Sequence, residues 1–514
     1  MKELSIIPRA YQQAIFETAK NSNTLVVLPT GLGKTLIALM LSIHRKKLFP
    51  LSKILILAPT RPLIEQHFSS FKKMLPELFA DLQLFTGSVP AKERRKIFQT
   101  AEIIFSTPQC IANDVRKGLY SLAEVSLLVI DEAHRCLKNY DYTKVVASYK
   151  SQAQDTLILG LTASPGTDAE KVREICKHLN INEIEVRTRD SPDVKEYLKE
   201  REYEKIEVEF PKELIEMRVI LKQILNKSLN ILQQKGYLPG PVNKISLLKL
   251  QTSLALRASQ GDGSAMYGMS LTAQALKISH ALELLETQTL AGLNEYLSTL
   301  LQQASENKSK AVKTLVSYPE FNALRISLAE QLTKNNEHPK IASLVNTLKK
   351  EFENNKDAKI LVFTQFRDTA QTIKKALAEQ IQIKSAIFVG QAKKTSSLGS
   401  TGLNQKEQKQ VVEKFTSGEL NVLIATSIGE EGLDIPEVSA VIFYEPIPSA
   451  IRKIQRAGRT ARLSKGKLII LITKGTRDEI SHYASTAREK KMYKVIEQVK
   501  QELKNRTRTL EEFK

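Results

Sequence analysis

Tryptophan is absent from this chain of 514 residues, and aromatic residues make up only 6% of it. This composition argues against binding that depends on stacking with aromatic rings. The three cysteines, Cys110, Cys136 and Cys176, lie far apart without a C-x-x-C pair. Their number and spacing argue against a disulfide framework or a zinc site and for a reduced setting.

Long hydrophobic runs are also missing. No apolar run approaches the ~20 residues that cross a bilayer, and Met1–Arg9 lacks the apolar core of a signal peptide. We therefore expect a soluble protein with no membrane partner. Its expected location is cytoplasmic, at the nucleoid if the source is prokaryotic or archaeal.

Positive charge is abundant. The chain has 76 lysines and arginines against 56 aspartates and glutamates, which gives a net charge of +20 and a pI near 9.5. This excess favours a polyanionic partner, most often nucleic acid, although a solvated basic surface has the same composition. With few aromatic residues, such binding would depend on backbone charge and weaken steeply with salt. The length predicts roughly three domains.

Short apolar runs recur in two parts of the chain, and each is followed by a polar or loop-forming stretch. Such runs are typical of strands buried on both faces of a parallel sheet. In the first part they are Leu25–Leu28, Ile54–Ala58, Ile103–Ser106, Leu127–Ile130 and Leu157–Leu161. In the second part they are Ile360–Phe363, Ala386–Val389, Val422–Ala425, Val441–Phe443 and Leu468–Ile472. The sequence predicts an α/β fold with two parallel sheets and ligand sites beyond the strand carboxyl ends.

The apolar spacing becomes helical between these parts, as in Leu214, Met217 and Leu221. We therefore expect an all-α insertion between two sheet domains. Tyr237–Pro241 and Gly261–Gly268 should interrupt its helices, whereas residues 393–405 should form a loop in the second sheet domain. The expected domains are residues 1–203, 204–335 and 336–492, followed by a charged helical tail over 493–514.

The string Thr30–Thr35 (T-G-L-G-K-T) follows the first apolar run and should open a helix. Gly31 and Gly33 permit backbone conformations that direct N–H groups toward phosphate. Lys34 would supply positive charge to the phosphates of ATP, and Thr35 would offer a hydroxyl to Mg²⁺. The strict pattern has a further glycine six residues before the lysine, where this chain has Leu28. An ordinary strand–turn–helix is the alternative for this string alone.

The string Asp131–His134 (D-E-A-H) follows a second buried run. Asp131 could hold Mg²⁺ through water, and Glu132 is placed to polarise an attacking water. His134 could link this site to the second sheet domain or form a local hydrogen bond. After a phosphate loop and a buried strand, the string indicates nucleotide hydrolysis.

The string Gln455–Arg462 (Q-R-A-G-R-T-A-R) in the second sheet domain should lie on a helix. Gln455, Arg459 and Arg462 are candidate catalytic residues. The two arginines are three positions apart and would share one helix face. Two guanidinium groups on one face suit the charge that develops during phosphoryl transfer, although a solvated basic face has the same spacing.

Together these strings resemble superfamily 2 helicases of the D-E-A-H type, especially the Hef group, the archaeal relatives of the Fanconi-anaemia complementation group M translocase. The strings most similar to Hef are Ser164–Gly166, Ser191–Val194, Phe388–Gln391 and Gln405–Gln408. The resemblance covers nearly the whole chain. It implies two RecA-like domains and a thumb-like helical insertion. The E-R-K pattern of the C-terminal nuclease common in that group is not found, so we expect a monomer without that nuclease domain.

The resemblance also assigns roles to nucleotide-binding and coupling residues. Pro8–Gln12 (P-R-A-Y-Q) resembles an adenine-recognition motif, with Gln12 reading the base and Arg9 nearby. Thr162–Ser164 (T-A-S) resembles the motif that couples hydrolysis to movement, through Thr162 and Ser164.

Residues 425–436 resemble helicase motif V, with Thr426 on nucleic acid and Gly432 and Asp434 facing the nucleotide. Small or polar residues that follow the predicted strands suit contacts to phosphate and sugar, which position a strand without reading its sequence. These candidate contacts are Thr60, Arg61, Thr86, Gly87, Thr107, Thr364 and Thr426.

Basic residues of the insertion suggest a grip on the duplex arm of a branched substrate, although ordinary helix surface is the alternative. They are Lys222, Lys227, Lys235, Lys244, Lys249 and Arg257. Neutralising Lys244, Lys249 and Arg257 should weaken binding to a fork more than binding to a single strand.

The expected function is an ATP-dependent DNA helicase or translocase that acts on forked or Holliday-type DNA in replication-fork repair. The resemblance implies a 3′-to-5′ direction and allows a nuclease or a replication clamp as partner. One alternative is an ATPase that depends on duplex RNA. Another is a non-catalytic module that binds branched DNA and recruits a nuclease.

Overall fold

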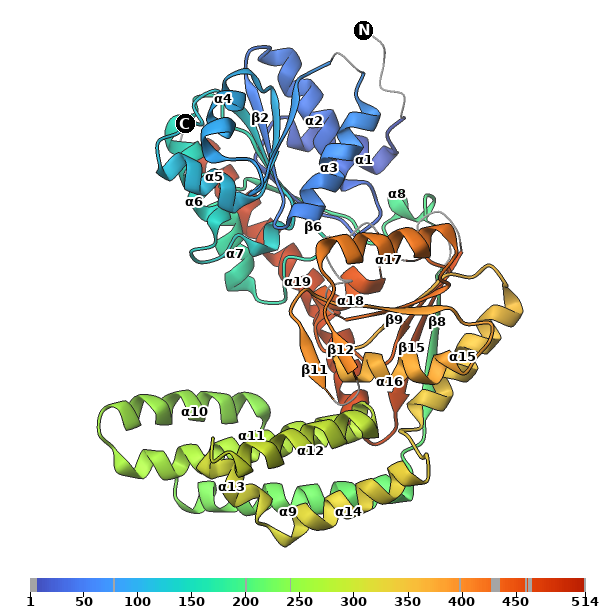
Figure 1. The fold of residues 1–514 in the computed structure, drawn as a ribbon. Helices are drawn as coiled ribbons and strands as arrows, with labels where there is room; N and C mark the ends of the chain where they lie inside the picture. Colours follow the sequence, from blue (N-terminus) through green and yellow to red (C-terminus); the bar gives the residue numbers. More distant parts are fainter. Residues whose placement is uncertain are drawn as a thin grey trace.

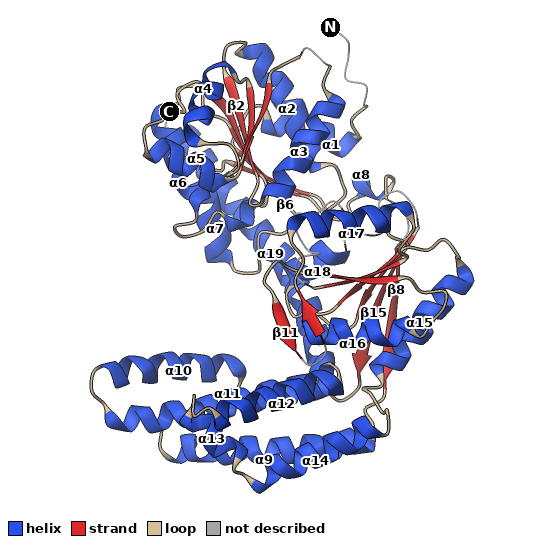
Figure 2. Cartoon of the chain, in the orientation of Figure 1, coloured by secondary structure: helices blue, strands red, loops and turns tan. Residues whose placement is uncertain are grey.

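Two lobes built on parallel sheets and one helical body make up the molecule (Figure 1). The computed structural model describes residues 7–76, 79–198, 201–240, 242–396, 399–426, 435–457, 460 and 465–512. Strands are confined to the two lobes, and the body between them in sequence is entirely helical in the described residues (Figure 2). The predicted α/β class with an all-α insertion is therefore confirmed.

The first lobe contains a seven-stranded sheet with the order β3-β4-β2-β5-β6-β1-β7, in which every pairing is parallel. Its strands are β1 Thr24–Val27, β2 Lys53–Leu57, β3 Leu82–Phe85, β4 Ile103–Ser106, β5 Val125–Ile130, β6 Ile158–Thr162 and β7 Glu183–Val186. Its helices are α1 Ala10–Ala19, α2 Lys34–Leu48, α3 Arg61–Met74, α4 Ala91–Thr100, α5 Pro108–Arg116, α6 Asp141–Gln152, α7 Ala169–His178 and α8 Pro192–Lys195, with a 3₁₀ turn at Ala133–Arg135.

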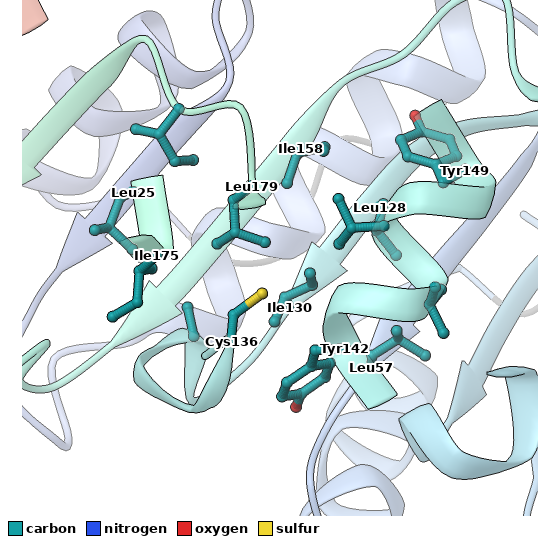
Figure 3. Packing of buried hydrophobic residues seen from close by; sticks show 14 of the residues in the cluster. Leu25, Leu57, Leu128, Ile130, Cys136, Tyr142, Tyr149, Ile158, Ile175 and Leu179 are labelled. Carbon is teal, nitrogen blue, oxygen red and sulfur yellow. The ribbon is translucent and has the colours of Figure 1, made fainter. Parts of the chain in front are cut away.

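Helices cover both faces of this sheet, which is why its strands are almost continuously apolar. Helices α1, α2 and α3 pack on one face, where Val26 and Ile56 point. Helices α4 to α7 pack on the other face, in one cluster with Leu25, Leu128 and Ile130. Figure 3 shows part of this cluster, with Ile130 of β5 beside Tyr142 of α6. Burial on both sides fixes the strand ends and therefore the loops that follow them.

The second lobe has a six-stranded parallel sheet with the order β10-β13-β9-β14-β15-β8. Its strands are β8 Arg201–Val208, β9 Ile360–Phe363, β10 Ser385–Phe388, β13 Val422–Ala425, β14 Ala440–Phe443 and β15 Gly466–Thr473. Its helices are α15 Lys340–Asn354, α16 Arg367–Ala378, α17 Gln405–Ser417 and α18 Ala450–Ala457. Helices α15 and α16 cover one face, and α17 and α18 cover the other.

The insertion consists of α9 Lys212–Gln234, α10 Lys244–Ser259, α11 Gly263–Thr287, α12 Leu290–Ser305, α13 Lys310–Val316 and α14 Pro319–Thr333. Its main core joins α9, α11, α12, α13 and α14, and a smaller cluster holds α10 on α9 and α11.

A buried polar junction joins the insertion to the second lobe. Lys340 is 0% exposed; its ammonium group pairs with Asp478 and donates to the carbonyl of Thr287 at 3.0 Å. Nearby, the Gln288 carbonyl accepts from Tyr444 at 3.4 Å. Because these contacts come from three separate segments, the end of α11 is fixed to the base of the second lobe.

The last helix, α19 Arg477–Glu512, starts in the second lobe and ends against the first (Figure 1). Its residues Met492, Val495, Ile496 and Val499 are buried in the same core as the sheet of the first lobe. Further along, Glu502 accepts two hydrogen bonds from Arg173 of α7, both at 2.9 Å. The segment expected as a charged tail is helical up to Glu512, and one side of it is apolar and packed.

Several local expectations differ from the structure. The segment 393–405 was expected as a loop, but it contains a hairpin of β11 Lys394–Ser396 and β12 Gly399–Thr401. Helix α11 already begins at Gly263, inside the expected interruption. Strand β8 crosses the expected boundary at residue 203 and pairs with β15 of the second sheet. A helix was expected over residues 455–462: residues 455–457 belong to α18, Thr460 forms a bridge with Val438, and the other residues of this range lie outside the described part of the chain.

Within the ranges that the structure describes, no helix is long and apolar enough to cross a membrane.

Candidate functional site: a nucleotide cleft and a strand-binding edge

The phosphate loop lies between β1 and α2. Gly31 and Gly33 have φ values of 86° and 77°, a left-handed conformation that only glycine adopts without strain. Helix α2 begins at Lys34, so its free N–H groups face the loop that starts at Thr30. The position at which the strict pattern has glycine is Leu28, which is fully buried and whose carbonyl accepts from the Lys34 ammonium at 3.0 Å.

The predicted adenine-recognition residues contact this loop directly. The Gln12 side chain accepts from the backbone N–H of Arg9 at 2.9 Å and donates to the carbonyl of Leu32 at 3.2 Å. The same carbonyl accepts from the Tyr11 hydroxyl at 2.8 Å. The Arg9 guanidinium lies 5.3 Å from the ring centre of Tyr197. Sequence reasoning assigned no role to either tyrosine, although Tyr11 lies within the string Pro8–Gln12.

The acidic string follows β5 and faces the phosphate loop. Asp131 is 5% exposed; burial raises its pKa, but the hydrogen bond and charge of His67 and the charge of Lys34 lower the pKa more, so the net pKa is below its usual value. His67 Nε2 lies 2.8 Å from Asp131 Oδ2. The structure therefore brings together Lys34 and Asp131, which are far apart in the sequence, and adds His67 from α3.

Glu132 starts a short polar chain toward β6. Its backbone is left-handed, with φ of 50°, and its Oε2 atom is buried without a hydrogen-bond partner in the described part of the chain. His134 Nδ1 lies 3.2 Å from Glu132 Oε2 and 3.2 Å from the Thr162 hydroxyl. The Thr162 hydroxyl accepts from the backbone N–H of Ser164 at 3.1 Å. The three predicted coupling residues are thus contiguous.

These features fit a magnesium-bound nucleotide. The loop offers N–H groups and an ammonium at the start of a helix, and Asp131 and Thr35 offer oxygen ligands of the type Mg²⁺ prefers. Glu132 Oε2 makes no hydrogen bond among the described residues and lies 3.2 Å from His134 Nδ1, so it is a suitable acceptor for a water.

The second lobe borders the same region. A cavity of about 590 Å³ lies between the lobes. It is lined on the first lobe by Pro29, Thr30, Thr188, Arg189, Asp190, Lys195 and Leu198, and on the second by Tyr203, Lys453, Ile454, Ala457, Leu468, Glu489 and Tyr493. Gln455 lies on α18, between the lining residues Ile454 and Ala457 in the sequence. Arg459, Arg462, Gly432 and Asp434 lie outside the described residues.

The candidate strand contacts of the first lobe gather at one edge. Strands β3, β4 and β2 are neighbours, and their carboxyl ends carry Thr86 and Gly87, Thr107, and Thr60 and Arg61 respectively. Thr60 and Thr107 also precede the first residues of α3 and α5. Five predicted contacts thus share one sheet edge.

The two candidate strand contacts of the second lobe, Thr364 and Thr426, are both buried. Thr426 is 5% exposed, and Thr364 is 0% exposed with its hydroxyl 3.3 Å from Glu445 Oε2. The backbone N–H of Gln365 donates to Glu445 Oε1 at 2.5 Å. Burial raises the pKa of Glu445 to about 7, although Lys340 and Arg456 lower it. Because the Thr364 hydroxyl is engaged with Glu445, a strand contact from it would require a rearrangement.

Sequence reasoning also missed a basic face on α4. Lys92, Arg95 and Lys96 have the spacing of one helix face; all three are exposed, and none forms an ion pair within the described ranges. On the opposite face, Arg94 is buried and makes two hydrogen bonds to Asp114, both at 2.6 Å. This anchor holds α4 next to the Thr86–Gly87 loop. The i, i+3, i+4 spacing of the basic residues was the signal that could have identified them.

Family models match three consecutive parts of this chain. They are the DEAD/DEAH box helicase at residues 9–172, a helical bundle of the ATP-dependent RNA helicase type at 213–334 and the helicase conserved C-terminal domain at 339–464. With the two lobes and the loop facing D-E-A-H, these matches define the class as DEAD/DEAH-box helicases, which use ATP. The helicase domain of Hef from Pyrococcus furiosus, solved as a crystal structure, is 41% identical, with a TM-score of 0.71 over 93% of this chain and 98% of that one. The chain belongs to the Hef family of helicases, which is related to Fanconi anaemia group M proteins.

Curated relatives extend beyond the part that this chain matches. A protein of Methanocaldococcus jannaschii, named as an ATP-dependent RNA helicase, is 37% identical over 501 residues, which cover 96% of this chain and 61% of the relative. The DEAD-box ATP-dependent DNA helicase Fancm of Drosophila melanogaster is 32% identical over 505 residues, which cover 92% of this chain and 33% of the relative. The chain thus spans less than two thirds of either.

Proposed function

We propose that this chain is an ATP-dependent DNA helicase or translocase that acts on forked or Holliday-type branched DNA in replication-fork repair. The observation that carries the proposal is the meeting of Lys34 and Asp131, with Glu132 next to them, beside a phosphate loop whose Pro29 and Thr30 line the cavity between the lobes. The name of the Fancm relative, a DNA helicase, supports DNA as the substrate.

Each nucleotide-site residue has a distinct role in this proposal. Gln12 and Arg9 bind the base, while the loop Thr30–Gly33 and Lys34 hold the phosphates. Thr35 and Asp131 hold Mg²⁺. Magnesium-bound ATP supplies the γ-phosphoryl group, whose charge the ion helps to neutralise. Glu132 orients the attacking water.

The second lobe completes the site when the cleft closes. Gln455, Arg459 and Arg462 would then face the phosphates, where an arginine contributes about 10³–10⁵ in rate in related chemistry. Gly432 and Asp434 would contact the nucleotide. His134, Thr162 and Ser164 would transmit the closure of the cleft to the residues that contact the strand. Repeated closing and opening would then move the lobes along the strand in the 3′-to-5′ direction.

The DNA strand would follow the carboxyl-end edges of both sheets, through Thr60, Arg61, Thr86, Gly87 and Thr107 of the first lobe and Thr364 and Thr426 of the second. The thumb-like insertion would contact the duplex arm. Three of its candidate residues are already paired: Lys227 lies 2.6 Å from Glu320, Lys244 lies 2.9 Å from Glu283, and Arg257 lies 2.6 Å from Asp262. Within the set chosen for neutralisation, Lys244, Lys249 and Arg257, only Lys249 forms no ion pair among the described residues, so it should contribute most of their effect.

The proposal includes the domain limits and partners. The first RecA-like domain is residues 1–203, the thumb-like insertion 204–335 and the second RecA-like domain 336–492, followed by a tail at 493–514. The protein acts as a monomer and cooperates with a nuclease or a replication clamp.

A second candidate function is an ATPase that depends on duplex RNA. The name of the M. jannaschii relative favours it, because that name specifies RNA. ATP hydrolysis measured with forked DNA, single-stranded DNA and duplex RNA separates the two functions. Strongest stimulation by forked DNA supports the proposal, and stimulation by duplex RNA alone refutes it.

The substitution Lys34→Ala tests the catalytic assignment. It removes the ammonium group from the phosphate site while leaving α2 intact, because alanine favours helix. We expect hydrolysis to fall to background with an unchanged circular dichroism spectrum. Retained turnover would contradict the assignment, whereas absence of turnover in the wild type would favour a non-catalytic module.

A further inference from the structure

Helix α3 extends from the strand-binding edge to the predicted magnesium ligand. Its first turn carries Thr60 at the N-cap and Arg61, both proposed strand contacts. His67 lies about two turns later on the same helix, roughly 10 Å along its axis. His67 is 6% exposed and faces into the lobe beside Ile64 and Phe71. Helix α3 thus has one end at the strand and its middle at the acidic site.

The Asp131 carboxylate is held on both oxygens. Oδ1 accepts from the backbone N–H of Glu132 at 2.9 Å, and Oδ2 lies 2.8 Å from His67 Nε2, which donates to it. The backbone of Asp131 is fixed separately, since its N–H donates to Leu57 at 2.8 Å and its carbonyl accepts from Tyr142 at 2.7 Å. The hydrogen bond from His67 therefore comes from an element that is not part of the acidic loop.

The other ring nitrogen of His67 is not tethered. His67 Nδ1 is buried and has no hydrogen-bond partner among the residues the structure describes. The direction of Nε2–H is therefore set by the position of α3 and its packing. A shift or rotation of α3 would move this donor relative to Asp131, which is anchored to β2 and α6.

We propose that His67 is a positioning residue that links strand binding at the start of α3 to the orientation of the Asp131 carboxylate. This inference rests on the proposed function, because it uses Thr60 and Arg61 as strand contacts and Asp131 as a magnesium ligand. Strand binding fixes α3, and α3 fixes Nε2–H on Oδ2. Groups that orient a metal ligand in this way change metal affinity by about 10- to 100-fold when they are removed.

Two substitutions separate this role from simple packing. His67→Leu keeps an apolar side chain on the stripe of Ile64 and Phe71 but removes the donor. His67→Gln keeps an N–H near the position of Nε2. The control is His44→Gln on α2, which changes a histidine that packs on Phe16 and makes no contact with Asp131.

The first measurement avoids turnover. Binding of a fluorescent ADP derivative is titrated with Mg²⁺, and the Mg²⁺ concentration for half-maximal binding is recorded. We expect His67→Leu to require about tenfold more Mg²⁺ or above, His67→Gln to lie near the wild type, and His44→Gln to match it. An unchanged Mg²⁺ requirement in His67→Leu would overturn the proposal.

The second measurement is the stimulation of ATP hydrolysis by single-stranded DNA at saturating Mg²⁺, with thermal melting as a check of the fold. Stimulation should fall in His67→Leu and return in His67→Gln, while DNA binding without nucleotide stays unchanged. Equal loss in both variants, with lowered melting temperatures, would show a packing role and overturn the link. If neither single-stranded nor forked DNA stimulates the wild type, the proposed function fails, and the Mg²⁺ requirement alone decides whether His67 positions Asp131.

Discussion

Neutralising the basic face of α4 should reduce the salt dependence of nucleic-acid binding by a defined amount. The perturbation is Lys92→Gln, Arg95→Gln and Lys96→Gln together; Arg94 is left unchanged because it anchors α4 to Asp114. The three charges are exposed and unpaired in the described structure, so each is free to displace one counterion. At a slope of about 0.7 to 0.9 per phosphate contact, the slope of log affinity against log salt should fall by about 2 to 3.

This change of slope translates into affinity. Between 50 and 200 mM salt, the wild type should lose about 20- to 40-fold more affinity than the triple variant. Fluorescence anisotropy with a labelled single strand at several salt concentrations measures both slopes. The control replaces Lys349, Lys350 and Lys356, which are exposed on and after α15 of the second lobe, with glutamine. A variant slope equal to that of the wild type, or an equal fall of the slope in the control, would show that the basic face of α4 makes no specific contribution to nucleic-acid binding.

Three further predictions concern stability. Lys340→Met leaves the buried Asp478 without its ammonium partner and should lower the free energy of unfolding of the second lobe in urea by about 3–5 kcal/mol. Adding Asp478→Asn should recover most of this loss. A double variant as unstable as the single one would contradict the prediction. Burial raises the pKa of Glu445 to about 7, so ionisation of this side chain opposes folding above that pH. The cost disappears as the pH falls toward the usual pKa of a glutamate. Glu445→Gln should therefore raise the melting temperature at pH 8 but not at pH 5, and equal effects at both pH values would refute the prediction. Ile496→Ala should cost about 2–5 kcal/mol of packing and expose the end of α19 to proteolysis, while Lys494→Ala, on the exposed side, should not; equal cleavage of both would count against the buried anchor.

The buried strands could be predicted because their composition depends on local burial. All five runs expected in the first lobe correspond to strands, and Ile103–Ser106 matches β4 residue for residue. Strands β3 and β7 were missed, since they lie at the sheet edges and are only partly buried. Half-buried edge strands lack the continuous apolar pattern that marks a central strand.

Contacts between segments far apart in the chain could not be predicted from the sequence. Strand β8 follows the first lobe in the chain but pairs with β15, and nothing in its composition specifies that partner. Met492, Val495, Ile496 and Val499 have an i, i+3, i+4, i+7 spacing, yet the surrounding lysines and glutamates made this segment look like a charged tail. Burial there comes from packing on another lobe, which local charge does not report.

The residues of the candidate site also fall into two groups, those with a local sequence signal and those without one. Thr30–Thr35 and Asp131–Glu132 were found because phosphate and magnesium chemistry requires particular residue types at fixed spacing. His67 and Glu445 were missed because they act through contacts to residues far away in the sequence. A lone histidine or glutamate has no spacing from which a role can be predicted.

The return of α19 to the first lobe also has a geometric consequence. The chain crosses from the first lobe to the second between α8 and β8, and it crosses back along α19. A body tied to another at one point can swing and twist in any direction, whereas a body tied at two points can turn only about the line that joins them. With the second crossing, the two lobes are attached to each other at two places. Opening and closing of the cleft is then the rotation that both attachments permit.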